Sequence, residues 1–198
     1  MRRFACIVEG YGEVPSVPGL LRRISTELFS TTVEILHPIR IPKAKLLRPG
    51  ELEKAIELAA RKVGPDDAVL VLLDADDHCP AELGPQLLHR ARAVRADRRI
   101  RVVLAKTEYE AWFIAAAPSV AGHRGLDPGL MRPPDPEAIH GAKEWLRDRC
   151  TQGANYREAV DQAALTAVFD LQMARSADSF DKLCRDFREL LSEKSQES

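Results

Sequence analysis

The apolar stretch Ala68–Leu73 (AVLVLL), which runs directly into Asp74-Ala75-Asp76-Asp77, decides the fold. A strand with one face in water alternates apolar and polar residues, whereas this stretch is apolar at every position. Both of its faces must therefore be buried, which is typical of a strand inside a parallel sheet that helices cover on both sides. The sequence thus predicts a buried strand whose carboxyl end carries acidic side chains.

The segments on either side of this stretch alternate between strand and helix patterns. Short apolar runs predict strands at Phe4–Val8, Val33–Ile41 and Ile100–Ala105. The segments between them carry apolar residues at a helical period, as in Leu52, Ala55, Ile56, Ala59 and Val63. This order predicts an α/β fold of Rossmann-like type, with a mostly parallel four-stranded sheet flanked by helices.

The pattern changes after residue 117, where the chain becomes mainly helical. Helices are expected at Tyr109–Ala117, Glu137–Arg149, Ala159–Arg175 and Ser179–Leu191. We expect one domain over residues 1–191, followed by a flexible tail at 192–198. Its parts are an α/β core (1–117), a loop rich in glycine and proline (118–136), and a helical extension that forms a C-terminal layer (137–191).

Composition limits the classes of function. The 198 residues carry a formal net charge of −1, which argues against a large independent nucleic-acid footprint. No apolar run is long enough to span a bilayer, and Glu9 interrupts the apolar start too early for a signal peptide. The four cysteines lie far apart, without the spacing of a zinc site. We therefore expect a cytoplasmic protein that does not act at a membrane.

Acidic residues follow three of the predicted strands. Glu9 and Glu13 follow the first, Asp74 and Asp76 the third, and Glu110 the fourth. Carboxyl ends of parallel strands meet at one edge of the sheet, where ligands bind. Crowded carboxylates repel one another unless a cation or protons compensate them, and their oxygens suit Mg²⁺ or Mn²⁺. A simpler interpretation of an Asp-x-Asp pair alone is a solvated turn or a helix cap.

The arrangement of these residues resembles the Toprim pattern, in which a glutamate ends a first strand and Asp-x-Asp follows a third. The segment Val8–Glu13 (VEGYGE) is similar to the start of the OLD and RloB-like nuclease branches. Leu73–Asp77 is similar to their acidic turn, and Glu108–Phe113 to their third motif. The whole chain resembles a bacterial Toprim-like family of unknown function, often found beside ATPase genes.

The resemblance implies a division of roles. Glu9, Asp74, Asp76 and Glu110 would hold Mg²⁺ or Mn²⁺. Glu9 and Glu13 would also serve catalysis, and Lys143 would offset phosphate charge. The implied function is phosphodiester chemistry on DNA or RNA, as a nuclease. The implied context is a bacterial defence module, in which the protein acts as an effector with an ATPase partner.

Two other functions remain open. One is a non-catalytic Toprim module that binds nucleic acid or an ATPase, and the other is a phosphotransferase for a small phosphorylated substrate. The number of crowded carboxylates favours catalysis, since a pure binding module has no need of them. The basic stretch from Arg90 to Arg101 is interpreted either as a solvated helix face or as a patch that follows phosphates.

Overall fold

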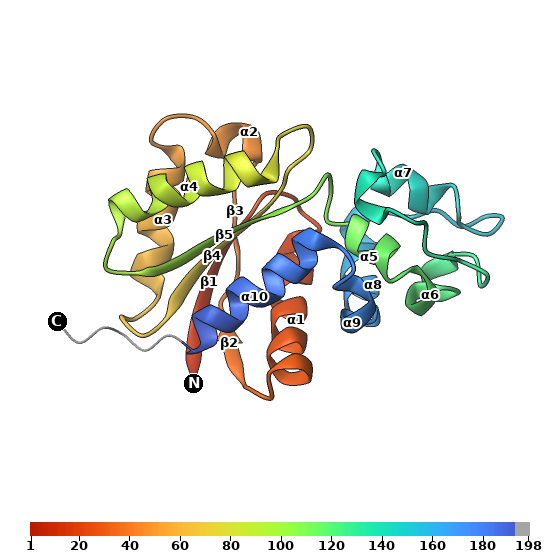
Figure 1. The fold of residues 1–198 in the computed structure, drawn as a ribbon, viewed down its shortest axis with the longest axis horizontal. Helices are drawn as coiled ribbons and strands as arrows, with labels where there is room; N and C mark the ends of the chain where they lie inside the picture. Colours follow the sequence, from red (N-terminus) through yellow and green to blue (C-terminus); the bar gives the residue numbers. More distant parts are fainter. Residues whose placement is uncertain (193–198) are drawn as a thin grey trace.

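A computed structural model describes residues 1–192 as an α/β fold built on one sheet (Figure 1). The strand order is β2-β1-β4-β5, β3 pairs with β1 as well, and every pairing is parallel. The predicted α/β class and parallel sheet are confirmed. The strands are β1 (Arg2–Val8), β2 (Val33–Ile35), β3 (Ile39–Arg40), β4 (Ala68–Asp74) and β5 (Arg99–Ala105).

The sheet has five strands, where the sequence predicted four. The single strand expected at Val33–Ile41 is two short ones, which pair with different parts of β1: β2 lies beside Arg2–Phe4, and β3 lies beside Ile7 and Val8. Pro38 lies between β2 and β3 and has no N–H to donate to a strand ladder, so it separates them.

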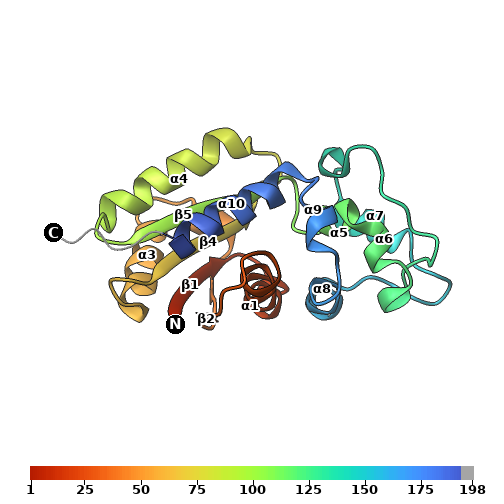
Figure 2. The same ribbon diagram turned by 60° about the horizontal axis from the view of Figure 1, so that its bottom comes forward.

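Helices cover both faces of the sheet (Figure 2). Alternate residues of β1 point to opposite faces: Phe4 and Cys6 pack in one apolar cluster, and Ala5 and Ile7 in another. On the first face lie α1 (Glu13–Arg23) and α10 (Asp178–Ser192), and on the second lie α3 (Glu51–Lys62) and α4 (Pro80–Val94). This double cover explains why β4 is buried along its whole length.

Five further helices gather beyond the carboxyl end of β5 (Figure 1). Apart from α6, which begins the stretch expected to be a loop, they are shorter than the sequence predicted, because local signals interrupt them. Gly141 adopts a left-handed conformation (φ 72°), and the helix therefore forms only in the middle of the expected range Glu137–Arg149. Asp170 caps a new helix and thereby divides the one expected at Ala159–Arg175. The helices are α5 (Ala111–Ala115), α6 (Ala117–Val120), α7 (Ala142–Arg147), α8 (Glu158–Thr166) and α9 (Leu171–Ala174).

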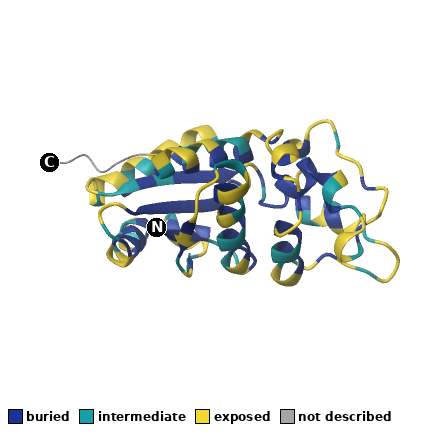
Figure 3. Cartoon of the chain, turned by 90° about the horizontal axis from the view of Figure 1, so that it is seen from below, coloured by how far each residue is buried: buried dark blue, intermediate teal, exposed yellow. Residues whose placement is uncertain are grey.

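The helices that follow β5 therefore form two parts. The group from α5 to α9 stands at the edge of the sheet, and α10 returns across its face (Figure 1). One apolar cluster joins the two parts, because Phe187 packs on Phe4 of β1 with ring centroids 4.8 Å apart, while Phe180 packs on Trp112 of α5. Buried residues run continuously from the sheet into the group of short helices (Figure 3).

The remaining elements are short. A π-helix (Ile24–Leu28) extends α1, α2 (Lys43–Leu46) follows β3, and two 3₁₀ turns lie at His123–Gly125 and Pro136–Ala138. Within residues 1–192, no helix has an apolar stretch long enough to cross a membrane. The tail predicted to be flexible lies outside the described residues, apart from Ser192, which ends α10.

Candidate active site

Glu9 and Asp74 meet at the carboxyl ends of β1 and β4, as the predicted strand order requires. The backbone N–H of Asp74 donates a hydrogen bond of 3.2 Å to Oε2 of Glu9. The Asp74 carboxylate accepts a second bond, of 2.8 Å, from the backbone N–H of Tyr109. Asp74 is therefore fixed between the ends of β1 and β5, and its side chain is almost fully buried.

Glu13 is held beside them by the turn that connects β1 to α1. Its Oε2 accepts a hydrogen bond of 2.5 Å from the backbone N–H of Gly10. A Cβ atom at Gly10 would lie only 2.5 Å from that oxygen and 3.0 Å from Oε1 of Glu158. The glycine after Glu9 is thus required so that two carboxylates can approach the backbone closely.

Glu110 comes from the turn between β5 and α5 and is completely buried. Its Oε1 accepts hydrogen bonds from the Tyr156 hydroxyl at 2.7 Å and from Nε2 of Gln162 at 3.2 Å. Its Oε2 has no hydrogen-bond donor among the residues described. A buried carboxylate oxygen without a donor is costly, so this oxygen is suited to a ligand that brings positive charge.

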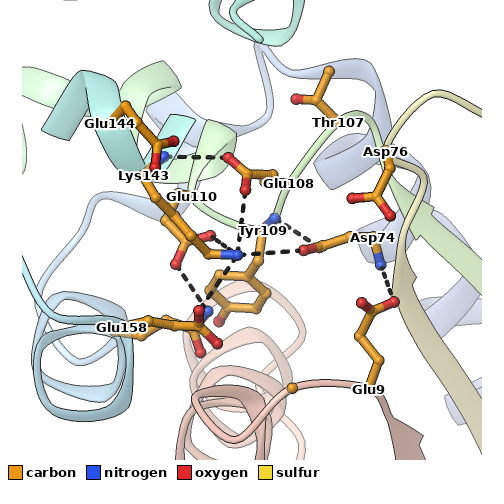
Figure 4. A network of polar contacts seen from close by, with 12 residues as sticks. Glu9, Asp74, Asp76, Thr107, Glu108, Tyr109, Glu110, Lys143, Glu144 and Glu158 are labelled. Atoms are coloured by element: carbon orange, nitrogen blue, oxygen red, sulfur yellow. Dashed lines mark hydrogen bonds and ion pairs between the residues drawn. The ribbon is translucent and has the colours of Figure 1, made fainter. Parts of the chain in front are cut away.

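Lys143 stands in the middle of the acidic side chains (Figure 4). Its Nζ lies 3.3 Å from Glu108, 3.4 Å from Glu158, 3.9 Å from Glu110 and 4.0 Å from Asp74. Burial disfavours its charge, but these carboxylates outweigh that effect and raise the pKa of the ammonium. Lys143 therefore supplies permanent positive charge at the site.

Asp76 lies next to this cluster but faces another cation. Its carboxylate forms an ion pair with Lys43, whose Nζ also donates to the backbone oxygen of Asp74 at 3.0 Å. Asp76 has a left-handed backbone conformation (φ 47°), and so does Thr107 (φ 61°). The backbone N–H of Asp76 donates a hydrogen bond of 2.9 Å to the backbone oxygen of Thr107. Such conformations in non-glycine residues are uncommon and gather at functional sites. Of the predicted metal ligands, Asp76 is the one whose carboxylate pairs with Lys43.

The buried carboxyl groups resist ionisation. Burial raises the pKa of Glu13 to about 7, even though the Gly10 N–H opposes the shift, and the nearby charges of Glu9 and Glu110 add to it. Burial, followed by the charges of neighbouring glutamates, raises the pKa of Asp74 well above its usual range. Burial also raises the pKa values of Glu9 and Glu110, against the opposing charges of Lys43 and Lys143 respectively. Metal ions compete with protons at such a site.

These shifts predict an unusual dependence of stability on pH. A carboxyl whose pKa is higher in the folded protein binds protons preferentially there, so its contribution to stability is lost as pH rises. For Glu13 the loss extends from its ordinary value of 4.5 to about 7. We expect the free energy of unfolding in EDTA to fall by about 2 kcal/mol across this range.

The matched variants are Glu13→Gln, which keeps an acceptor for Gly10, and Glu82→Gln on the exposed surface of α4. Urea unfolding at several pH values should show that the first variant reduces the dependence between pH 4.5 and about 7 by the share that Glu13 contributes, whereas the second leaves it unchanged. A Glu13→Gln variant with the same pH profile as wild type would show that Glu13 ionises normally.

Sequence patterns did not identify several residues at this site. Glu158 is the first residue of α8 and Gln162 lies within it, far along the chain from every acidic motif. Lys43 is the first residue of α2, directly after a proline. Each reaches the site only through the packing of its helix. The basic stretch near Arg90 lies elsewhere: Arg90 pairs with Glu53, and other arginines pair with Asp97 and Glu189. These acidic partners favour the solvated-face interpretation.

The carboxylates are arranged around Lys143 rather than around a shared metal position. Among residues 1–192, no three His, Cys, Asp or Glu side chains are arranged as a metal-binding group. They surround the Lys143 ammonium instead.

The fold and this edge define a parallel α/β protein with a buried acidic site at the carboxyl ends of its strands. The chain belongs to the family described as a domain of unknown function (DUF4276), whose family model matches residues 8–188. This range includes every residue placed at the site above. No significant match was found among curated proteins or among solved structures.

Proposed function

We propose that this edge of the sheet is a metal-dependent active site for phosphodiester hydrolysis in nucleic acid. The observation that carries the proposal is the concentration of carboxyl groups around Lys143, which lies within 4.0 Å of four of them, and two of the four, Asp74 and Glu110, are buried. A fold has no structural need to bury so many carboxylates together, because their desolvation and repulsion destabilise it. Sites arranged in this way are typical of catalysis or metal binding.

The donor set fits Mg²⁺ or Mn²⁺. All of its atoms are carboxylate oxygens, which these ions prefer, and Oε2 of Glu110 lacks a hydrogen-bond donor. Glu9, Asp74 and Glu110 are the proposed ligands. Asp76 joins them only if its ion pair with Lys43 opens. When bound, the metal supplies an activated water molecule and neutralises charge on the phosphate.

The protein's own side chains have complementary roles. Glu13, whose pKa is raised to about 7, is suited to accept a proton from an attacking water molecule near neutral pH. Lys143 remains charged and binds a phosphate oxygen. Tyr156 and Gln162 orient Glu110 through their hydrogen bonds to Oε1. The resemblance to Toprim nucleases, together with the net charge of −1, supports an effector that shares its substrate-binding surface with an ATPase partner.

One observation favours a second candidate, the non-catalytic module that binds nucleic acid or an ATPase. Lys143 already balances part of the acidic charge, so the edge is stable to some extent without a metal. The small-molecule phosphotransferase has no comparable support, since neither the hollow beside Arg3 and Asp67 nor the one beside Arg124 and Asp161 is lined by a residue of the acidic edge.

A cleavage assay separates these candidates. Purified protein is incubated with labelled single-stranded DNA, duplex DNA and single-stranded RNA in Mg²⁺, Mn²⁺, Ca²⁺ or EDTA. We expect cleavage of at least one substrate in Mg²⁺ or Mn²⁺ and none in EDTA. Binding without cleavage under every condition, including in the presence of a neighbouring ATPase, would favour the non-catalytic module.

A further inference from the structure

Tyr11 stands out because it is a large aromatic residue on the surface beside the acidic edge. Its side chain is 70% exposed, whereas the other two tyrosines, Tyr109 and Tyr156, are buried. It lies two residues after Glu9, between Gly10 and Gly12, in the turn that forms the site. A single exposed tyrosine is ordinary, so the notable features are its place beside the candidate active site and the contacts that hold its ring there.

Arg40 holds this ring in place. The guanidinium carbon of Arg40 lies 3.8 Å from the centroid of the Tyr11 ring, and its Nη2 donates to the Tyr11 hydroxyl at 3.1 Å. Nη1 of Arg40 also donates to the backbone oxygen of Glu9 at 3.3 Å. One face of the ring is therefore stacked on a cation that is itself attached to the end of β1. A ring ordered in advance loses little conformational freedom when a ligand stacks on it.

Basic residues continue from this pair along the chain. The segment Arg40–Arg48 (RIPKAKLLR) contains four basic residues and no acidic one, although the whole chain carries a net charge of −1. Lys43 reaches the end of β4, and Lys45 and Arg48 are exposed on and after α2. Lys43 is buried and pairs with Asp76, and Lys45 lies 3.6 Å from Glu51, so the positive charge that continues from Arg40 along the surface is that of Lys45 and Arg48.

We infer that Tyr11 and Arg40 form a platform on which a base of single-stranded nucleic acid stacks, and that Lys45 and Arg48 bind its phosphates. This inference rests on the proposed function and specifies its substrate. An exposed ring next to a basic strip is the combination by which proteins bind single strands, since every unpaired base offers a flat face. Bases within a duplex are already stacked on one another, so a duplex gains little from the platform.

The test measures binding by fluorescence anisotropy in EDTA, so that catalysis does not intervene. The probes are short fluorescein-labelled oligothymidylate, oligouridylate and a duplex. We expect Tyr11→Ala to weaken binding of a single strand about tenfold and to affect the duplex much less. Tyr11→Trp should bind the single strand as wild type does, because the ring remains. Lys45→Ala with Arg48→Ala should weaken all binding and reduce its dependence on salt.

Matched controls remove similar groups elsewhere. Met131 is an exposed apolar residue outside the site, and Arg61 and Lys62 lie at the far end of α3. Met131→Ala, and Arg61→Ala with Lys62→Ala, should each bind as wild type does. Circular dichroism of every variant confirms that a change in binding does not reflect unfolding.

The outcomes distinguish this inference from the proposed function. If Tyr11→Ala binds and cleaves single strands as well as wild type, the platform is wrong and the catalytic proposal stands. If wild type binds single strands through Tyr11 but cleaves nothing in Mg²⁺ or Mn²⁺, the platform stands and the catalytic proposal fails. A wild-type protein that binds no single strand in EDTA overturns the platform, and the cleavage assay in Mg²⁺ or Mn²⁺ then decides the catalytic proposal by itself.

Discussion

Asp74→Asn is expected to reduce metal-dependent cleavage by on the order of 10³-fold or more while the protein stays folded. The variant keeps Oδ1, which accepts the Tyr109 N–H, but it removes the negative charge that a metal ligand at this position provides. Because burial disfavours the ionised Asp74 carboxyl in the folded protein, a neutral side chain of the same shape should stabilise the fold slightly near neutral pH. The assay follows labelled substrate and the melting temperature together.

Asp77→Asn is the matched control, since Asp77 is an exposed acidic residue in the same turn. It should retain full activity. An Asp74→Asn variant that cleaves as well as wild type would mean that the chemistry lies elsewhere. A variant that unfolds would mean that Asp74 is needed to cap the ends of β4 and β5.

Lys143→Met is expected to give the largest loss of stability at the site. Removing the ammonium leaves Asp74, Glu108, Glu110 and Glu158 facing one another without the cation that lies 3.3–4.0 Å from them. Because the carboxyl groups can take up protons, we expect a decrease of about 2 kcal/mol at neutral pH, below the full penalty for an unpaired buried charge. Urea unfolding in EDTA measures it.

Mg²⁺ or Mn²⁺ should restore most of the stability that Lys143→Met loses, since a cation bound to the folded state stabilises it in proportion to its affinity. The same ions should stabilise wild type less, because Lys143 already occupies part of the site. Lys45→Met, on the exposed surface of α2, should lose little stability and gain from the metal only as much as wild type gains. A Lys143→Met variant that responds to Mg²⁺ no more than the control would argue against a metal site.

Much of the fold can be read from single segments. The apolar run of β4 predicts a strand covered on both sides, and the periodic apolar residues of α3 and α10 predict the helices that cover it. Each of these signals lies within a single segment of the sequence. The errors also have local causes, since Pro38 divides a predicted strand and Asp170 a predicted helix.

The site is only partly predictable, because many of its contacts join residues that are distant in the sequence. Glu9, Glu13, Asp74 and Glu110 follow strands, and the parallel order alone places strand ends at one edge. The position of the short helices over that edge depends on tertiary packing, which no single segment of the sequence specifies. Lys143 was expected to contact phosphate, yet its place among four carboxylates depends on how α7 packs, and Glu158 depends on α8. The ion pair that turns Asp76 toward Lys43 likewise joins residues distant in the sequence.

The most direct test of the central claim is anomalous diffraction from crystals of the wild-type protein soaked in Mn²⁺. The account predicts a strong anomalous peak at about 2.2 Å from a carboxylate oxygen of Asp74, with Glu9 or Glu110 as a second ligand. It also predicts that the Lys143 ammonium has moved away from these oxygens. A map without a peak at saturating Mn²⁺, in which Lys143 still contacts all four carboxylates, would contradict the account.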